Sequence, residues 1–146
     1  EMPDCSVHLV ESLGWKADFL LACVRALDLE SRVMVHPIRA EEATAAVGRE
    51  SLDAGTARAV AAPLIVAEYL SPLVRVGGHL VLWTTAPHAA RPEVAGRTDL
   101  GLGVPDVRPL PSPLRDDGVL LVWPKVGPCS DRFPRRTGVA TKRPLT

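Results

Sequence analysis

The sequence contains few cysteines and no long apolar run, and both features narrow the class of protein. Its three cysteines, Cys5, Cys23 and Cys129, are odd in number and widely spaced. They fit neither a disulfide framework nor a zinc site, so we expect reduced thiols in a cytoplasmic protein. No stretch approaches the ~18 uninterrupted apolar residues that a membrane helix needs. The N-terminus also lacks the basic-then-apolar pattern of a signal peptide, so we expect no membrane partner.

Charge is distributed unevenly along the chain, although the formal net charge is zero. Residues 125–146 hold six Lys/Arg and one Asp, a net charge of +5, and the rest holds 11 Lys/Arg against 16 Asp/Glu, or −5. A basic segment on a mildly acidic body indicates contact with an anionic partner. The alternative is a solvated end that only keeps the protein in solution. Ten of the 14 prolines lie between Pro87 and Pro144, which predicts loops and short extended pieces there.

The pattern of apolar residues predicts an α/β fold in a chain that has the length of one domain. Strands are expected at 7–10, 32–36, 52–56 and 79–83, and helices at 14–27, 41–49 and 63–73. Strands that alternate with helices imply parallel βαβ units in a three-layer, mostly parallel sheet. Ser12 should cap the first helix, and Gly77-Gly78 should turn the chain into the 79–83 strand. Segments 104–110 and 119–125 have no helix between them and should form an antiparallel pair at a sheet edge.

Residues suited to binding a nucleotide follow the first two predicted strands. In open α/β sheets, ligands bind at the carboxyl ends of the strands. Glu11 ends the first strand, where a carboxylate can accept two hydrogen bonds from the hydroxyls of a ribose. An acid stabilised by the helix dipole is the alternative interpretation. Ala40 and Glu41 follow the second strand, where a loop could hold an adenine ring, but two acids that open a helix are also ordinary.

Arg58 follows the third predicted strand, within the small and apolar run Thr56–Ala61. Burying a guanidinium without a partner is costly, so Arg58 should point into a site and pair with a carboxylate. The alternative is an arginine that reaches water at the end of a strand. The sequence shows no Ser/His/Asp or Cys/His grouping, and its four histidines have no metal-ligand spacing. We therefore expect no metal, and the catalytic residues stay unknown.

Five segments match the patterns of one protein family, in order and along nearly the whole chain. They are Glu11–Lys16 with Phe19-Leu20, Arg39-Ala40-Glu41, Ala57–Leu64, Pro72–Gly78, and the basic stretch Arg132–Leu145. The chain thus resembles the RsmG (GidB) family of methyltransferases, which act on small-subunit ribosomal RNA. The resemblance covers about the C-terminal two-thirds of the family's length.

The resemblance implies a class I methyltransferase fold, which is a Rossmann-like, seven-stranded sheet. It also implies methyl transfer from S-adenosylmethionine to guanine N7 of small-subunit (16S) rRNA. It places Ala40, Glu41 and Arg58 at the cofactor, and Glu11 near the cofactor's ribose. Guanine N7 has an in-plane lone pair, so it can attack the sulfonium methyl without first losing a proton. Proximity and alignment then suffice, and no general base is required.

Three departures from the family pattern bear on this interpretation. The family's glycine-rich loop, first strand and N-terminal helices have no counterpart here, so we expect an N-terminally truncated chain. Glycine lets backbone N–H groups approach a cofactor closely, and without that loop we expect the chain to be inactive by itself. Trp83-Thr84-Thr85 stands where Lys-Gly often follows the strand. Pro37-Ile38 replaces a favoured glycine, and Thr137 replaces a usual proline.

We expect a partial methyltransferase domain at residues 1–128 and a basic tail at residues 129–146, in a monomeric protein. The tail has cations without a pattern for base readout, so they should contact rRNA phosphates: Arg132, Arg135, Arg136, Lys142 and Arg143. Phe133 could add a stacking contact to an exposed base. Two alternatives are a non-catalytic RNA-binding remnant and a small-molecule methyltransferase of the same fold. The basic tail argues against the second.

Overall fold

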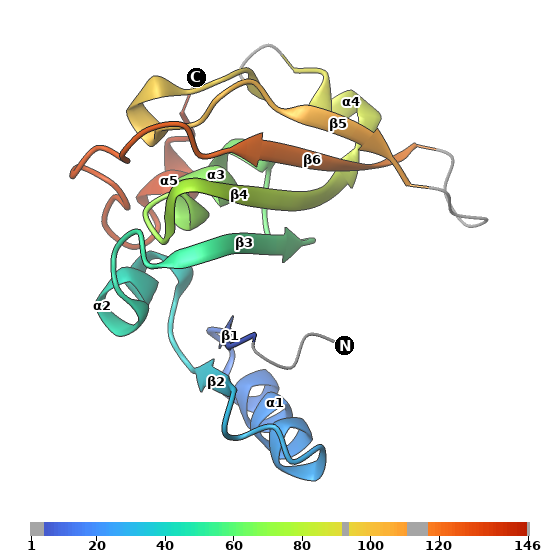
Figure 1. Cartoon of the computed structure of the whole chain (residues 1–146), viewed down its shortest axis with the longest axis vertical. Coiled ribbons are helices and arrows are strands. Elements are labelled where there is room, and N and C mark those ends of the chain that lie inside the picture. The colour runs from blue at the N-terminus through green and yellow to red at the C-terminus, as the bar shows by residue number, and fades with distance from the viewer. Residues whose placement is uncertain (1–4, 92–93, 111–116, 146) are drawn as a thin grey trace. The chain divides into compact units, whose positions relative to one another are not determined.

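The computed structural model describes residues 5–91, 94–110 and 117–145, which form two compact units (Figure 1). Unit 1 extends to Val47, and unit 2 begins at Gly48. Each unit has its own sheet and is described by itself. Every helix within the described ranges is too short or too polar to span a bilayer.

Unit 1 is a single βαβ arrangement followed by two short helical segments. Its elements are strand β1 (Val7–Val10), helix α1 (Gly14–Ala26), strand β2 (Val33–His36), 3-10 helix η1 (Ala40–Glu42) and helix α2 (Ala43–Val47). β1 and β2 pair in parallel, with Val7 opposite Val33 and Val10 opposite His36. The parallel pairing confirms the prediction for this part of the chain, because a helix between two strands returns the second strand in the same direction.

Helix α1 differs from the prediction at its start, and its apolar face is only partly covered. Leu13 is the N-cap and no side chain caps the helix there, so the role predicted for Ser12 is wrong. On the apolar face of the helix, Val24 is buried but Phe19 is 65% exposed. The helical period identifies an apolar face, but two strands of four residues offer too little area to cover all of it.

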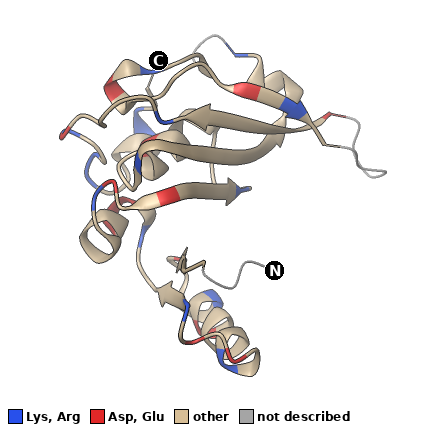
Figure 2. Ribbon diagram, in the orientation of Figure 1, with Lys and Arg blue, Asp and Glu red and all other residues tan. Residues whose placement is uncertain are grey.

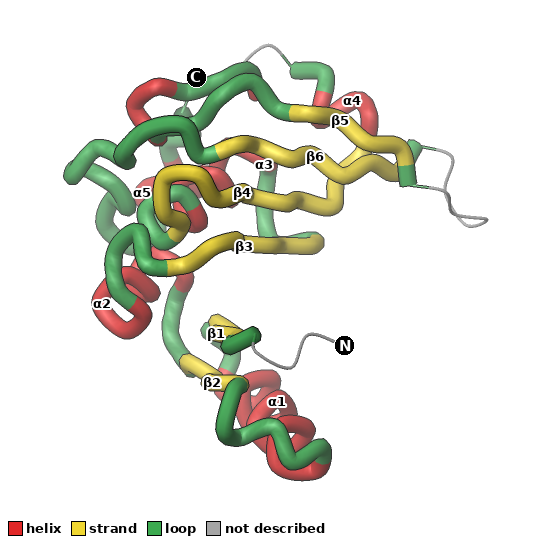
Figure 3. Tube along the Cα trace, in the orientation of Figure 1, coloured by secondary structure: helices red, strands yellow, loops and turns green. Residues whose placement is uncertain are grey.

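Unit 2 contains a four-stranded sheet whose spatial order is β3-β4-β6-β5 (Figure 3). Its strands are β3 (Leu52–Arg58), β4 (Val74–Thr85), β5 (Asp106–Pro109) and β6 (Gly118–Pro124). β3 and β4 are parallel, whereas β6 is antiparallel to both β4 and β5. The parallel pair and the antiparallel edge confirm the predicted α/β class.

The core of unit 2 lies on one face of this sheet. Helix α3 (Pro63–Leu70), helix α4 (Ala86–Ala89) and 3-10 helix η3 (Thr98–Leu100) contribute to it, together with alternate residues of β4 and β6. Buried and half-buried residues alternate along β6, as the two-residue period of a strand requires. Pro63 opens α3 in its first turn, where a missing N–H leaves no helical hydrogen bond unmade.

β4 begins earlier than predicted, because Gly77-Gly78 forms a bulge within the strand and not a turn before it. Leu52 pairs with Val74, but Ala54 pairs with His79, so the register shifts between these two pairs. Gly77 has a φ of +86°, and a Cβ on Gly78 would lie 2.4 Å from the carbonyl oxygen of Asp53. Glycine is required at both positions, at one for its backbone conformation and at the other for the close approach.

The segment after β6 packs into unit 2, so residue 128 does not mark a boundary in the packing. Cys129 and Phe133 belong to the core, and helix α5 (Val139–Lys142) packs near α3. Arg49 donates hydrogen bonds of 2.6–2.9 Å to the carbonyl oxygens of Cys129, Ser130 and Phe133. The segment predicted as a basic tail thus contributes apolar side chains to the core.

Lys125 follows β6 directly, and its side chain is fully buried. The ammonium donates to Oε1 of Glu50 at 2.6 Å and to the carbonyl oxygens of Ser71 and Val74 at 2.9 Å. All three donors of the ammonium are therefore used. Glu50 also accepts the N–H of Cys129 at 2.7 Å. Burial raises the pKa of Glu50, but the hydrogen bonds from Lys125 and Cys129 outweigh burial and hold that pKa below its ordinary value.

A second buried ion pair joins α3 to the segment after β6. Glu68 is 1% exposed, and its carboxylate accepts hydrogen bonds from Nε of Arg135 at 2.8 Å and from Nη2 at 2.5 Å. The backbone N–H of Arg135 donates to the same carboxylate at 3.2 Å. These bonds raise the pKa of the Arg135 guanidinium. A buried charge is tolerated when it is paired in this way, so Arg135 serves the fold.

Replacing Arg135 by alanine should lower the free energy of unfolding by about 3 kcal/mol, because the buried Glu68 carboxylate would lose its partner. Arg136→Ala is the matched control, since Arg136 is the exposed neighbour and surface substitutions change stability by less than ~0.5 kcal/mol. Urea denaturation of both variants and of the parent chain measures the difference. Equal midpoints for the two variants would contradict a structural role for Arg135.

Candidate functional site

In unit 1, the residues predicted to bind a nucleotide lie at one edge of the sheet. Glu11 follows β1 directly, and its N–H donates to the carbonyl oxygen of His36 at 3.1 Å. Ala40 and Glu41 lie in η1, beyond the end of the parallel strand β2. The chain thus brings all three residues to the carboxyl edge of β1 and β2, where α/β sheets bind ligands.

The two oxygens of Glu11 have different surroundings. Oε1 accepts the N–H of Leu13 at 2.8 Å, at the start of α1. This contact is the helix-stabilising role that the sequence left as an alternative. Glu11 is partly exposed, so its second oxygen is the atom that a ligand hydroxyl could reach. The structural role and a binding role are therefore compatible for this carboxylate.

A pair of histidines next to this edge was not predicted from the sequence. Nδ1 of His8 lies 2.9 Å from Nε2 of His36, and the two rings stack with centroids 5.2 Å apart. Burial and the neighbouring His8 lower the pKa of His36. A signal for the pair was present in the predicted strands. His8 pairs with Met34, which lies two residues before His36, so both histidines project from the same face of the sheet. No group of three or more potential metal ligands occurs within the described residues.

In unit 2, Arg58 is the last residue of β3, and its side chain is exposed. The carboxylate partner predicted for it is not found, since the described residues give its guanidinium neither an ion pair nor a hydrogen bond. The structure thus shows the alternative, an arginine that reaches water at a strand end. Glu11 and Glu41 belong to the other unit, so their position relative to Arg58 stays a prediction.

The backbone is strained immediately after Arg58. Ala59 has a φ of +54°, the left-handed region, which costs a non-glycine residue roughly 1–3 kcal/mol. Strain of this kind persists where the surrounding structure imposes it, and it clusters at binding sites. The strained residue therefore marks the carboxyl end of β3 as the candidate site of unit 2.

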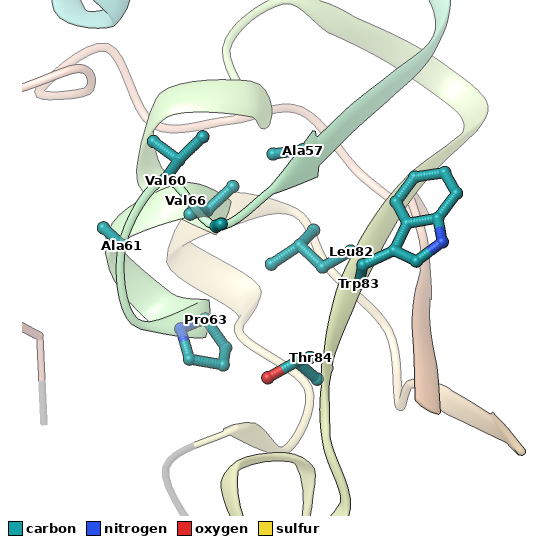
Figure 4. A pocket seen from close by; sticks show the side chains of 9 residues that line it. Ala57, Val60, Ala61, Pro63, Val66, Leu82, Trp83 and Thr84 are labelled. Carbon is teal, nitrogen blue, oxygen red and sulfur yellow. The ribbon is translucent and has the colours of Figure 1, made fainter. Parts of the chain in front are cut away.

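A small pocket, open to solvent, lies at this point (Figure 4). It is lined by the ends of β3 and β4 and the start of α3: Ala57, Ala59, Val60, Ala61, Pro63, Val66, Leu82, Trp83 and Thr84. Figure 4 shows the side chains of Leu82 and Trp83 leaving β4 in opposite directions. The lining side chains are apolar except for that of Thr84, so few polar side-chain groups reach the pocket.

Two of the six residues predicted to contact RNA belong to the interior of unit 2. Phe133 is 1% exposed, so its ring offers no face to an exposed base. Arg135 is held by Glu68. Both predictions are corrected, because neither the buried ring nor the paired guanidinium is available to a partner. Arg132 is only partly available to a partner. Its side chain is mostly exposed, but the guanidinium contacts Asp99 at 2.5 Å and lies over the Phe133 ring, 4.6 Å from the ring centroid.

Arg136, Lys142 and Arg143 are also exposed. They lie in α5 or close to it, where blue segments gather in Figure 2. In the described part of the chain, no acidic side chain pairs with any of them. Their charge is therefore available to an anionic partner, as the sequence predicted for them.

Solved structures of methyltransferases share this fold. The chain superposes on the citrinin polyketide synthase CMeT domain with a TM-score of 0.58 and 12% identity, covering 84% of this chain and 40% of that chain. It superposes on the 1,6-didemethyltoxoflavin-N1-methyltransferase of Burkholderia thailandensis with a TM-score of 0.52 and 15% identity, covering 84% of this chain and 72% of that chain. The latter structure contains 1,6-didemethyltoxoflavin and S-adenosylhomocysteine. At these identities the comparison establishes the fold, a class I methyltransferase fold.

Curated relatives match almost the whole chain and carry the name ribosomal RNA small subunit methyltransferase G. The protein of Rubrobacter xylanophilus is 37% identical over 99% of this chain and 58% of its own length. The protein of Roseiflexus sp. (strain RS-1) is 40% identical over 98% of this chain and 62% of its own length. The protein of Lactobacillus johnsonii is 37% identical over 98% of this chain and 61% of its own length. The chain therefore spans about three-fifths of the length of these relatives.

A family model agrees with these relatives. The model named GidB, described as rRNA small subunit methyltransferase G, matches residues 1–93, which include both proposed binding edges. The order and the spacing of the matched segments agree with the strands and helices of both units. The chain belongs to the GidB family, the rRNA small subunit methyltransferase G family.

Proposed function

We propose that the protein transfers the methyl group of S-adenosylmethionine to guanine N7 of small-subunit (16S) rRNA. The observation that supports this most strongly is the match to curated small-subunit rRNA methyltransferases over 98–99% of the chain. The methyltransferase fold, including one neighbour that contains S-adenosylhomocysteine, supports the choice of methyl donor. The substrate atom follows from the family resemblance.

We propose cofactor contacts for Glu11, Ala40 and Glu41 in unit 1 and, separately, for Arg58 in unit 2. The second oxygen of Glu11 suits the vicinal hydroxyls of a ribose, since its first oxygen already accepts from Leu13. Ala40 and Glu41 lie at the same edge of unit 1, where the backbone and one carboxylate can hold an adenine ring. The exposed guanidinium of Arg58 is free to contact the cofactor or the RNA from the end of β3.

The chemistry of the reaction fits a site of this composition. S-adenosylmethionine supplies an electrophilic methyl group on a sulfonium. The in-plane lone pair of guanine N7 would form a bond to this methyl group as the methyl carbon–sulfur bond breaks and S-adenosylhomocysteine leaves, and no proton needs to be removed first. The carboxyl ends of β3 and β4 support the candidate site near Ala59. Orientation of the two reactants is then the main contribution of the protein.

The test uses a fusion protein, in which this chain is joined to the part of the Rubrobacter relative that it does not match. We expect the fusion protein to methylate small ribosomal subunits. The subunits come from bacteria that lack their own family member, and the product is 7-methylguanosine, measured by mass spectrometry of the rRNA nucleosides. Subunits that are already methylated are the control and should gain no further 7-methylguanosine. The chain alone is tested in parallel and is expected to be inactive, as the sequence predicts.

Binding measurements with rRNA and S-adenosylhomocysteine, and methylation assays with small molecules, separate the alternative functions. Binding of rRNA without binding of S-adenosylhomocysteine would indicate a non-catalytic RNA-binding remnant. Methylation of a small molecule, with no transfer to rRNA, would indicate a different substrate class. Either result from the joined protein would contradict the proposed function.

We further propose that Arg136, Lys142 and Arg143 contact rRNA phosphates. Replacing all three by glutamine should flatten the dependence of rRNA affinity on salt, by roughly 0.7 in log K per log salt for each phosphate that is no longer neutralised. The control replaces Lys16, Arg25 and Arg108, which removes the same charge elsewhere. Titration of an rRNA fragment at several salt concentrations measures both variants. Equal slopes would contradict the phosphate contacts, and a loss of cofactor binding would indicate a packing role.

A further inference from the structure

Arg58 and Trp83 are direct neighbours on β3 and β4. The two residues pair in the parallel register of the strands. Paired residues of adjacent strands project from the same face of a sheet, and the strands lie about 4.8 Å apart. The two side chains therefore leave adjacent strands on the same face of the sheet. Figure 4 shows that the Trp83 ring leaves β4 on the side away from Leu82 and the buried core.

Both side chains are open to a ligand. The exposed fraction of Trp83 is 41%, although tryptophan is a large apolar side chain that folding normally covers. Arg58 is exposed and, within the described residues, makes no ion pair or hydrogen bond. The other tryptophan of unit 2, Trp123, is fully buried and donates its indole N–H to the carbonyl oxygen of Val94 at 3.1 Å. Trp83 is thus the indole of this unit that a ligand can reach.

The position of the pair in the fold matches a binding role. Arg58 ends β3, and Trp83 lies near the carboxyl end of β4, next to the strained Ala59. Ligands of open α/β sheets bind at this end. Aromatic rings and guanidinium planes are the side chains on which unpaired nucleic-acid bases stack, and tryptophan gives the strongest cation–π contact.

We propose that Trp83 and Arg58 form a stacking site for a purine base. The inference rests on the proposed function and refines it, because that reaction brings two purines to the protein. These are the adenine of the cofactor and the guanine of the rRNA. Purines are favoured over pyrimidines because the larger ring system covers more of the indole.

Tryptophan fluorescence tests the site in the intact chain. The Trp15→Phe variant is used as the parent, because Trp15 is the exposed indole of unit 1 and Trp123 is shielded. We expect S-adenosylhomocysteine, GMP or both to quench Trp83, and CMP to quench it several-fold less. Trp83→Leu should remove the quenching and weaken purine binding, measured by calorimetry, by about tenfold. Trp83→Phe should keep most of the affinity, because a smaller ring can still stack.

The two purine ligands distinguish the sources of the base. Quenching by S-adenosylhomocysteine alone assigns the site to the cofactor, and quenching by GMP assigns it to the RNA substrate. Quenching by CMP as strong as that by the purines, or unchanged purine affinity in Trp83→Leu, would overturn the proposal. Methyl transfer by a protein whose Trp83 does not respond would refute the stacking site alone. A response without methyl transfer by the joined protein would refute the proposed function instead.

Discussion

The buried ammonium of Lys125 is the interaction on which unit 2 depends. A charged group that is buried away from water is stable only when each of its donors has a partner. The Lys125 ammonium donates to Glu50, Ser71 and Val74. Glu50 precedes β3, and Val74 begins β4. One side chain placed after β6 therefore fixes the starts of both parallel strands. Through Glu50, which also accepts from Cys129, it fixes the returning segment as well.

This arrangement separates a fixed end of the sheet from an open end. The buried Lys125–Glu50 ion pair and the bulge at Gly77-Gly78 lie toward the starts of β3 and β4. The exposed Arg58 and the strained Ala59 lie at the opposite ends of those strands. A binding group is positioned well when its supporting strand is held elsewhere by packing and hydrogen bonds. Strain at Ala59 is tolerated because the anchored strands impose it.

The strands and the antiparallel edge could be predicted from the sequence because a strand's period is local and needs no knowledge of its neighbours. Glu11 could be placed for the same reason, as it directly follows an apolar run. The burial of Phe133 and the pairing of Arg135 could not be predicted. Arg135 bonds to Glu68, which is 67 residues away in the sequence, and an isolated glutamate on a helix is usually exposed. The charge of a segment therefore does not tell which of its cations are available.

Native-state hydrogen exchange of the chain tests most directly whether the segment after β6 belongs to the core. We expect the amides of Cys129 and Phe133, which donate to Glu50 and to Ser130, to open together with those of Leu121 in β6. They should then show the same free energy of opening, close to that of the whole unit. Exchange of residues 129–135 near the rate of an unfolded peptide, while β6 stays protected, would contradict the placement of this segment in the core.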